Sequence, residues 1–156
     1  MEHFACCFTG HRNLPHTEYN LVKIRLMNTV RTLAGEGVVY FITGGAVGFD
    51  TLAAQCVLAL RECELPGIKL ALFLPCHGQD VRWAEADRTE YRRIYHAADY
   101  KKILAPAYYD GCMRARNQLM VEKSDVCVAY VTRFGSGAGQ TLRMAQAAGR
   151  RIISLA

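Results

Sequence analysis

Residues 38–50 read VVYFITGGAVGFD, an apolar run that opens directly into a glycine-rich loop. The run at 38–43 is apolar on consecutive residues, as a strand covered on both faces requires. A helical pattern begins at Thr51, just after the loop. Strand, small-residue loop and helix in this order bring bare backbone N–H groups to an anion such as a phosphate. This stretch therefore predicts an α/β fold with an anion-binding loop.

A second stretch of the same kind lies toward the C-terminus. The apolar run at 126–131 leads to the loop GSGAGQT at 135–141, and a helical pattern follows. If both strands are parallel members of one sheet, the two loops emerge at the same edge. Two such loops at one edge indicate a ligand of nucleotide size, but they do not indicate a reaction.

Apolar runs and helical patterns alternate along the whole chain. The expected strands span 4–8, 38–43, 68–74, 102–104, 126–131 and 151–155, and the expected helices span 16–34, 51–62, 81–98, 112–123 and 141–148. Strict alternation predicts a mostly parallel sheet with helices on both faces. A chain of 156 residues without an internal repeat is expected to form a single domain over 1–156.

Composition limits the class of protein. Apolar residues make up 51% of the chain, yet no apolar stretch approaches the ~20 residues of a membrane span. The start, Met1-Glu2-His3, has no basic segment ahead of a long apolar one, so we expect no secretory signal. Seven cysteines without C-x-x-C spacing predict free thiols in a reducing compartment, and hence a cytoplasmic protein with no membrane partner.

The net charge of +5 arises from 19 Lys and Arg against 14 Asp and Glu. The basic residues are scattered, with local clusters at Arg88, Arg92 and Arg93 and at Arg114 and Arg116. So small an excess favours an anionic partner only weakly, and it is as common on a solvated surface as on a nucleic-acid-binding protein. Nucleic acid therefore stays an alternative partner, which the modest charge disfavours.

Ligands bind beyond the carboxyl ends of the strands in open parallel sheets. Four segments thus become candidates together: Thr9-Gly10-His11-Arg12, the loop at 44–50, Pro75-Cys76-His77-Gly78-Gln79, and the segment at 131–141. In the first of them, Gly10 allows close approach and Arg12 can grip a phosphate through two parallel hydrogen bonds. The alternative is a turn whose arginine faces water.

The glycine loops match neither of the common phosphate-binding signatures. Gly44, Gly45 and Gly48 do not form G-x-G-x-x-G, and the second loop has no lysine after its last glycine, so P-loop chemistry is not expected. The second loop still offers a nest of N–H and O–H donors from Gly135, Ser136, Gly137, Gly139 and Thr141. Its alternative is a flexible glycine turn before a helix.

Other side chains near these loops carry further chemistry. Asp50, near the start of a helix, could cap that helix or accept hydrogen bonds from ribose hydroxyls. Because its negative charge would repel a phosphate, we expect it nearer to the sugar than to the phosphate. Trp83 could stack on a base or lie in the core, and Gln79 precedes it. Cys76 and His77 have no second pair at ligand spacing, so no metal site is expected.

Asn117 interrupts an apolar helix stripe that it shares with Met113, Met120 and Val121. A polar side chain in such a place needs partners, either from the backbone or from a ligand. Its neighbour Arg116 could join the site, or it could remain a rim residue whose stem covers apolar surface.

Taken in this order, these segments resemble the SLOG superfamily, named for the Smf/DNA-processing A proteins and the LOG cytokinin-activating enzymes, and within it the YpsA-like branch. The matching residues span nearly the whole chain: Thr9-Gly10-His11-Arg12, Gly44-Gly45-Ala46-Val47-Gly48-Phe49-Asp50-Thr51, Leu74-Pro75-Cys76 with Gln79 and Trp83, Cys112-Met113-Arg114-Ala115-Arg116-Asn117 with Met120 and Ser124-Asp125, and the loop at 135–141. The resemblance implies a Rossmann-like fold, a pocket for a nucleotide or nucleotide-derived ligand, and a homodimer. Its branches differ in use: LOG enzymes hydrolyse nucleoside monophosphates, DNA-processing proteins bind single strands, and the YpsA branch is tied to bacterial cell division.

The chain departs from the LOG enzymes in their catalytic loop. Their final glycine loop runs into a catalytic glutamate, whereas Gln140-Thr141-Leu142-Arg143 stands here. Arg116 is similar to their helix arginine. Cleaving an N-glycosidic bond requires a group that stabilises a cationic sugar or activates water, and Asp50 is the only obvious candidate nearby. The resemblance to the LOG enzymes therefore does not extend to their catalytic glutamate, and no catalytic residue is assigned.

The leading hypothesis is a nucleotide-, NAD- or ADP-ribose-binding protein of the YpsA-like type, which the resemblance connects with a sensor role in bacterial cell division. The loop glycines would supply backbone approach, Arg12 and Arg116 would hold anionic oxygens, Asp50 would meet ribose and Trp83 would meet the base. The predicted ligand-binding residues are Thr9, Gly10, His11, Arg12, Gly44, Gly45, Gly48, Asp50, Gln79, Trp83, Arg116, Asn117, Gly135, Ser136, Gly137, Gly139 and Thr141. One alternative is a nucleoside monophosphate phosphoribohydrolase that uses Asp50 and Arg116. The other is a single-stranded DNA-binding protein, which the modest charge disfavours.

Overall fold

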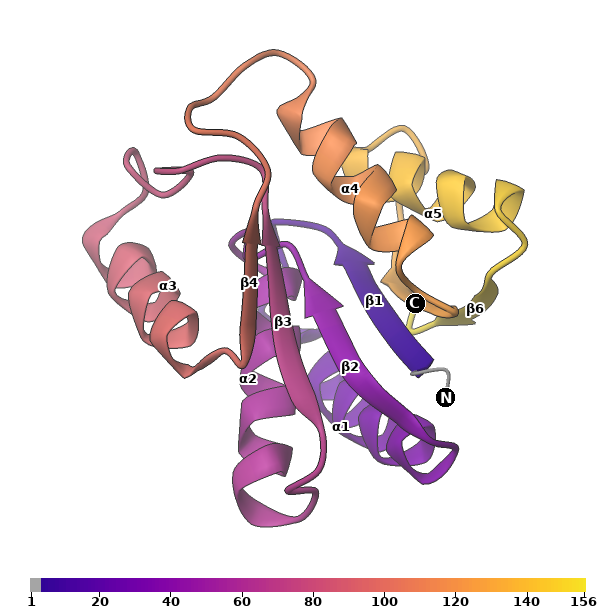
Figure 1. Cartoon of the computed structure of the whole chain (residues 1–156). Coiled ribbons are helices and arrows are strands. Elements are labelled where there is room, and N and C mark those ends of the chain that lie inside the picture. Colours follow the sequence, from indigo (N-terminus) through magenta and orange to yellow (C-terminus); the bar gives the residue numbers. More distant parts are fainter. Residues whose placement is uncertain (1–3) are drawn as a thin grey trace.

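The computed structural model describes residues 4–156 and shows one six-stranded sheet with helices on both faces (Figure 1). Met1-Glu2-His3, on which the expectation of no secretory signal rests, lies outside the described residues. The strands are β1 (Phe4–Gly10), β2 (Val38–Thr43), β3 (Lys69–Leu74), β4 (Tyr100–Ile103), β5 (Val126–Tyr130) and β6 (Arg151–Ser154), and the helices are α1 (Tyr19–Gly35), α2 (Phe49–Cys63), α3 (Glu85–Ala97), α4 (Cys112–Glu122) and α5 (Gly137–Ala147). All neighbouring strands are parallel, in the order β4-β3-β2-β1-β5-β6. The predicted Rossmann-like α/β fold is thus confirmed.

The central strands are apolar on consecutive residues because both of their faces are covered. In β1, Cys6 joins the apolar cluster that α1, α2 and α3 complete, whereas Cys7 joins the cluster that α4 and α5 complete. Every residue of β5 is buried. The continuous apolar runs of the sequence therefore correspond to strands with one helical layer on each side.

Two expectations from composition concern the cysteines and the membrane. The cysteines are free thiols, and all but Cys63 are buried, which confirms the prediction of unpaired thiols. In the described range 4–156, the helices lack the combined length and apolar content that crossing a bilayer demands.

The largest differences from the expected helix bounds lie at the starts of α5 and α3. α5 begins at Gly137 rather than 141, because the Ser136 hydroxyl accepts a hydrogen bond from the Gly139 N–H at 3.1 Å and caps the helix there. Part of the second glycine loop is therefore helical. α3 begins at Glu85 rather than 81, because two tight turns precede it, closed by Val81 N–H to Gly78 carbonyl at 3.2 Å and by Trp83 N–H to Asp80 carbonyl at 3.0 Å.

Phe49, the first residue of α2, anchors the first glycine loop to the sheet. Its ring packs on Phe8 and Tyr130 at centroid distances of 6.4 and 6.1 Å. Its backbone N–H donates to the His11 carbonyl at 3.1 Å. Gly10 makes room for this arrangement, because a Cβ at that position would overlap the Phe49 ring. The loops that follow β1 and β2 are thereby held side by side.

The chain changes the direction in which it adds strands after β4. β2, β3 and β4 extend the sheet on one side of β1, and β5 and β6 extend it on the other. Correspondingly, α4 and α5 cover a different face from α1, α2 and α3 (Figure 1). The carboxyl ends of β1 and β5 border this topological switch point, which is where open α/β sheets bind their ligands.

Candidate functional site

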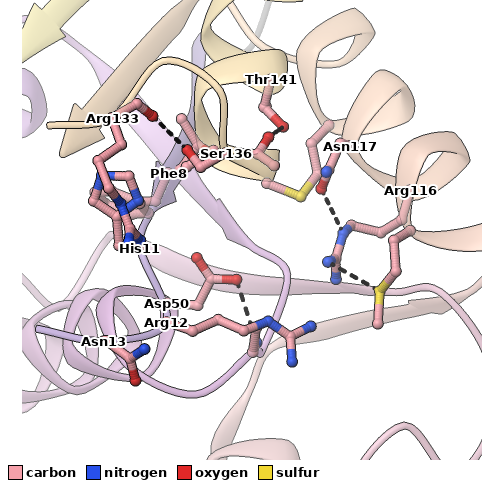
Figure 2. A pocket seen from close by; sticks show the side chains of 17 residues that line it. Phe8, His11, Arg12, Asn13, Asp50, Arg116, Asn117, Arg133, Ser136 and Thr141 are labelled. Atoms are coloured by element: carbon pink, nitrogen blue, oxygen red, sulfur yellow. Dashed lines mark hydrogen bonds between the residues drawn. The ribbon is translucent and has the colours of Figure 1, made fainter. Parts of the chain in front are cut away.

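A cavity of about 350 Å³ opens at the switch point. We call it the switch-point cavity; its walls are the end of β1 and the loop after it, the loop after β2, α4, and the start of α5 (Figure 2). It brings together many of the residues that the sequence singled out, namely Thr9, Gly10, His11, Arg12, Asp50, Arg116, Asn117, Ser136, Gly137 and Thr141. Three of the four expected segments therefore meet at this cavity, whereas the segment at 75–79 does not line it.

The other predicted residues lie outside the lining of this cavity: Gly44, Gly45, Gly48, Gln79, Trp83, Gly135 and Gly139. Several of the glycines are in close contact with other parts of the chain. A Cβ at Gly44 would overlap the guanidinium of Arg116, and a Cβ at Gly139 would overlap the backbone of Phe134. At these two positions the glycine makes room for another part of the chain and does not line the cavity.

Gln79 and Trp83 lie on the far side of the Gly44–Gly45 pair. The Gln79 amide donates to the Gly44 carbonyl at 3.2 Å and to the Tyr91 hydroxyl at 3.3 Å. Trp83 packs edge-on against Tyr91, with ring centroids 5.1 Å apart. Trp83 is thus neither in the main core nor over the switch-point cavity.

Arg116 is buried although it carries a charge. One of its terminal nitrogens, Nη1, donates to the Gly44 carbonyl at 2.6 Å and to the Phe73 carbonyl at 3.2 Å. Its Nε donates to Oδ1 of Asn117 at 2.8 Å, which supplies the partner that a polar residue on an apolar stripe needs. Burial lowers the pKa of Arg116, and the nearby Asp50 carboxyl partly opposes this shift. The alternative of a solvated rim arginine is therefore excluded.

Asp50 is the only carboxylate that lines the cavity. Its Oδ2 accepts a hydrogen bond from the Ala46 N–H at 3.2 Å, and the carboxyl makes no capping bond to its own helix. Burial raises its pKa to about 6, although the charges of Arg116 and Arg12 and the Ala46 N–H act in the opposite direction. The carboxyl therefore closes the glycine loop and titrates close to neutral pH.

This shift predicts a pH dependence of stability. Between the ordinary Asp value of 3.8 and about 6, the unfolded chain has released the proton of Asp50 while the folded protein retains it. The stabilisation that the protonated Asp50 carboxyl contributes is therefore fully present below pH 3.8, and it is lost as the pH rises through about 6. Relative to Asp50→Asn, wild-type protein should lose about 3 kcal/mol of unfolding free energy between pH 3.5 and pH 7.5. Urea unfolding of both proteins across this range measures it, and a pH-independent difference would contradict the shift.

His11 is held as an acceptor rather than as a donor. Its Nε2 accepts a hydrogen bond from the Thr132 N–H at 2.8 Å, and its ring packs edge-on against Tyr130. Burial lowers its pKa, and the neighbouring Arg133 lowers it further. The ring is therefore neutral at pH 7, and it ties the loop after β1 to the segment after β5.

The mouth of the cavity carries two exposed arginines, Arg12 and Arg133. Neither side chain makes a hydrogen bond or an ion pair with any residue in the described part of the chain. Nearby, the first two amides of α5, those of Gly137 and Ala138, also have no acceptor among residues 4–156. With Arg116 inside and Asp50 as the single carboxylate, the cavity is cationic and rich in free donors, which suits an anion.

Sequence reasoning missed some of the lining. Arg133 was not singled out, although it follows a strand end and a basic residue at such a place is a usable signal. The apolar lining residues Phe8, Ala46, Met113, Met120 and Ala138, and the exposed Asn13, were not assigned to the site either. Across residues 4–156, no three His, Cys, Asp or Glu side chains come together in a way that could hold a metal ion.

The fold and the cavity define a class, that of Rossmann-like α/β proteins with a cationic cavity at the topological switch point. Residues 6–147 match the model of the YpsA family, described as the YspA SLOG family. The chain belongs to this family, which confirms the resemblance to the SLOG superfamily and its YpsA-like branch.

The related sequences include bacterial proteins named UPF0398. A UPF0398 protein of Shouchella clausii is 30% identical over 112 residues, which cover 70% of this chain and 60% of the relative. The UPF0398 protein YpsA of Bacillus subtilis is 27% identical over 106 residues, which cover 67% and 58% respectively. The match thus spans 58 to 60% of the length of these relatives.

Two solved structures share the fold. DNA processing protein A from Helicobacter pylori, described for its single-stranded DNA binding mode, superposes with a TM-score of 0.65 at 24% identity, covering 97% of this chain and 64% of that one. The protein TM1055 superposes with a TM-score of 0.61 at 18% identity, covering 96% and 72%.

Proposed function

We propose that the protein binds a nucleotide or a nucleotide derivative of the ADP-ribose type in the switch-point cavity. One observation carries this proposal: two unpaired guanidinium groups, those of Arg12 and Arg133, stand at a cavity that also receives the free amides at the start of α5. A volume of about 350 Å³ lies within the usual range for small-molecule sites. The membership of the SLOG family agrees with a ligand of this class.

The residues that line the cavity suggest which of them contacts each part of such a ligand. A phosphate fits between the α5 amides and the forks of Arg12 and Arg133, which can each donate two parallel hydrogen bonds. Asp50 is buried in the same cavity, where its carboxyl can accept from ribose hydroxyls. The apolar side chains of Met113 and Met120 offer a surface for the base.

Arg12→Gln is expected to weaken binding of the ligand by roughly 10- to 100-fold, because a charge-assisted pair of hydrogen bonds is lost. The fold should be unaffected, since the Arg12 side chain is exposed and makes no bond with residues 4–156. Isothermal titration with NAD, ADP-ribose, ATP and nucleoside monophosphates provides the measurement. Arg114→Gln is the matched control, an exposed arginine outside the cavity lining. Absence of heat across the whole panel in the wild-type protein would refute the proposal.

Asp50 favours a second candidate function, hydrolysis of the N-glycosidic bond of a nucleoside monophosphate. Its carboxyl lines the cavity, and its pKa of about 6 is near the working pH, where a general acid or base is most effective. Incubation of the protein with nucleoside monophosphates, followed by chromatography for free base, tests this reaction. Base release that persists unchanged in Asp50→Asn would remove Asp50 from the mechanism.

A third candidate is the binding of single-stranded DNA, which the Helicobacter pylori protein of the same fold performs. The unpaired arginines at the cavity mouth are the feature that would contact a phosphate backbone. Binding of this kind weakens steeply as salt increases. A gel-shift titration with oligonucleotides at low and high salt separates it from the binding of a small ligand.

We also propose that the protein is a homodimer in the cytoplasm. The free cysteines are consistent with a reducing compartment. Light scattering coupled to gel filtration would give twice the monomer mass for a dimer, and it would give the monomer mass otherwise.

A further inference from the structure

A second cavity, of about 380 Å³, lies between α3 and the loop that follows β3. We call it the α3 cavity; its lining comes from that loop, from α3 and from the end of β4, and it shares no residue with the switch-point cavity. In Figure 1, α3 stands at the side of the molecule away from α5. The α3 cavity is therefore a separate place and not an extension of the proposed nucleotide site.

The Gly44–Gly45 pair lies against residues of both cavities. On one side, Gly44 leaves just enough room for the guanidinium of Arg116. On the other side, a Cβ at Gly45 would lie 3.3 Å from both Gln79 Nε2 and a ring carbon of Tyr91, which lines the α3 cavity. A side chain at either position would therefore press on a residue that lines one of the two cavities.

The α3 cavity has a basic wall. Arg88, Arg92 and His96 are spaced four residues apart on α3 and therefore share one helix face, which borders the cavity. His77 joins them from the opposite loop, and Asp80 is the single carboxylate in the lining. The Asp80 Oδ2 lies 3.7 Å from the Nε of Arg88, which is buried and has no hydrogen-bond partner. One carboxylate thus leaves the arginines with unused donors.

Neighbouring arginines on α3 differ in whether their side chains are paired. Arg93, which points elsewhere, makes two hydrogen bonds to Glu90 at 2.6 and 2.8 Å. Arg92 makes none with any side chain or carbonyl of the described chain, and it lines the cavity. The rest of the lining is apolar or aromatic and includes Tyr95 and Ile103.

We propose that the α3 cavity binds the phosphate group of a small phosphorylated molecule that carries an aromatic or apolar portion. The forks of Arg92 and Arg88 match the oxygens of a phosphate, and the tyrosine rings cover the remainder of the molecule. This proposal does not rest on the function proposed for the switch-point cavity, since the two sites have different arginines.

Phenyl phosphate is the probe, and isothermal titration with the full chain is the measurement. Arg92→Gln is expected to weaken binding at least about tenfold, because the unpaired fork is lost. Arg93→Gln removes the same charge one residue along the helix and should bind as the wild type does. Arg12→Gln alters the switch-point cavity, so it should leave unchanged the part of the binding that Arg92→Gln removes. Arg92→Lys keeps the charge without the fork, so its affinity should lie between those of the wild type and Arg92→Gln. Circular dichroism verifies that each variant is folded.

The fluorescence of Trp83 gives a second signal, because it is the only tryptophan and its ring packs against Tyr91 of the cavity wall. Phenyl phosphate should change this fluorescence with the same dependence on the variants. Wild-type affinity in Arg92→Gln would overturn the proposal. Loss of binding in Arg12→Gln would also overturn it, because the probe would then bind in the switch-point cavity. So would the absence of both the heat of binding and the fluorescence change up to about 10 mM probe.

Discussion

Arg116→Met is expected to lower the free energy of unfolding by about 3 to 5 kcal/mol, since breaking a buried charged network leaves its other members unsatisfied. The guanidinium donates to the carbonyls of Gly44 and Phe73 and to the side chain of Asn117. Methionine fills a similar volume but donates nothing to these oxygens. It also removes the largest favourable charge acting on the ionised form of Asp50. Urea unfolding at pH 7.5, followed by circular dichroism, measures the loss.

Arg114→Met is the matched control, because Arg114 is exposed and lies two residues earlier on the same helix. Its effect should stay within about 0.5 kcal/mol, as at other surface sites. In the double variant with Asp50→Asn, the loss should be smaller than the sum of the single losses, since no carboxylate then remains without its cation. A loss below about 1 kcal/mol for Arg116→Met would show that the network contributes little.

The fold could be predicted because its signals are local and repeated. A strand buried on both faces requires consecutive apolar residues, and 126–130 meets that requirement. Strict alternation with helices then leaves little choice but a parallel sheet. The same reasoning placed Thr9, Arg12, Asp50 and Asn117 at one edge, where they meet in one cavity. For these residues, sequence position and strand direction were sufficient.

The parts that could not be predicted depend on contacts between distant segments. The burial of Arg116 rests on its hydrogen bond to the carbonyl of Gly44, a residue 72 positions away. No local pattern distinguishes such an arginine from one that reaches water along an apolar stripe. The position of Trp83 is determined by the two turns that precede α3. Hydrophobic periodicity carries no information about such turns.

The glycine loops show a further limit of motif reasoning. Their spacing predicted bare N–H groups for a phosphate, but Gly137 is the one glycine of the two loops that lines the switch-point cavity. Gly44, Gly45 and Gly139 instead allow side chains and backbone to pack against them. A small residue in a loop therefore indicates close approach, but the approaching group can be the protein itself.

Gly48→Ala tests this role of the glycines most directly. Gly48 has a φ of 82° and a ψ of −123°, a conformation that other residues rarely adopt, and a Cβ there would overlap the backbone of Arg12. Strain at such a residue and overpacking each cost about 1 to 3 kcal/mol, so the unfolding free energy should fall by about 4 kcal/mol. Binding in the switch-point cavity should weaken as well, because the contact fixes the loop that carries Arg12.

Gly35→Ala is the control. It distinguishes the effects of the positive φ and the steric overlap at Gly48 from a general effect of replacing glycine by alanine. Gly35 lies in the last turn of α1 with nothing within 4 Å of its Cβ position and without a positive φ. Alanine there should stabilise the protein by about 0.5 kcal/mol, since it restricts the unfolded chain and favours the helix. Thermal and urea unfolding of the two variants side by side make the comparison. Equal effects at both positions would mean that the loop yields to a side chain, and that Gly48 is not what holds Arg12 beside the cavity.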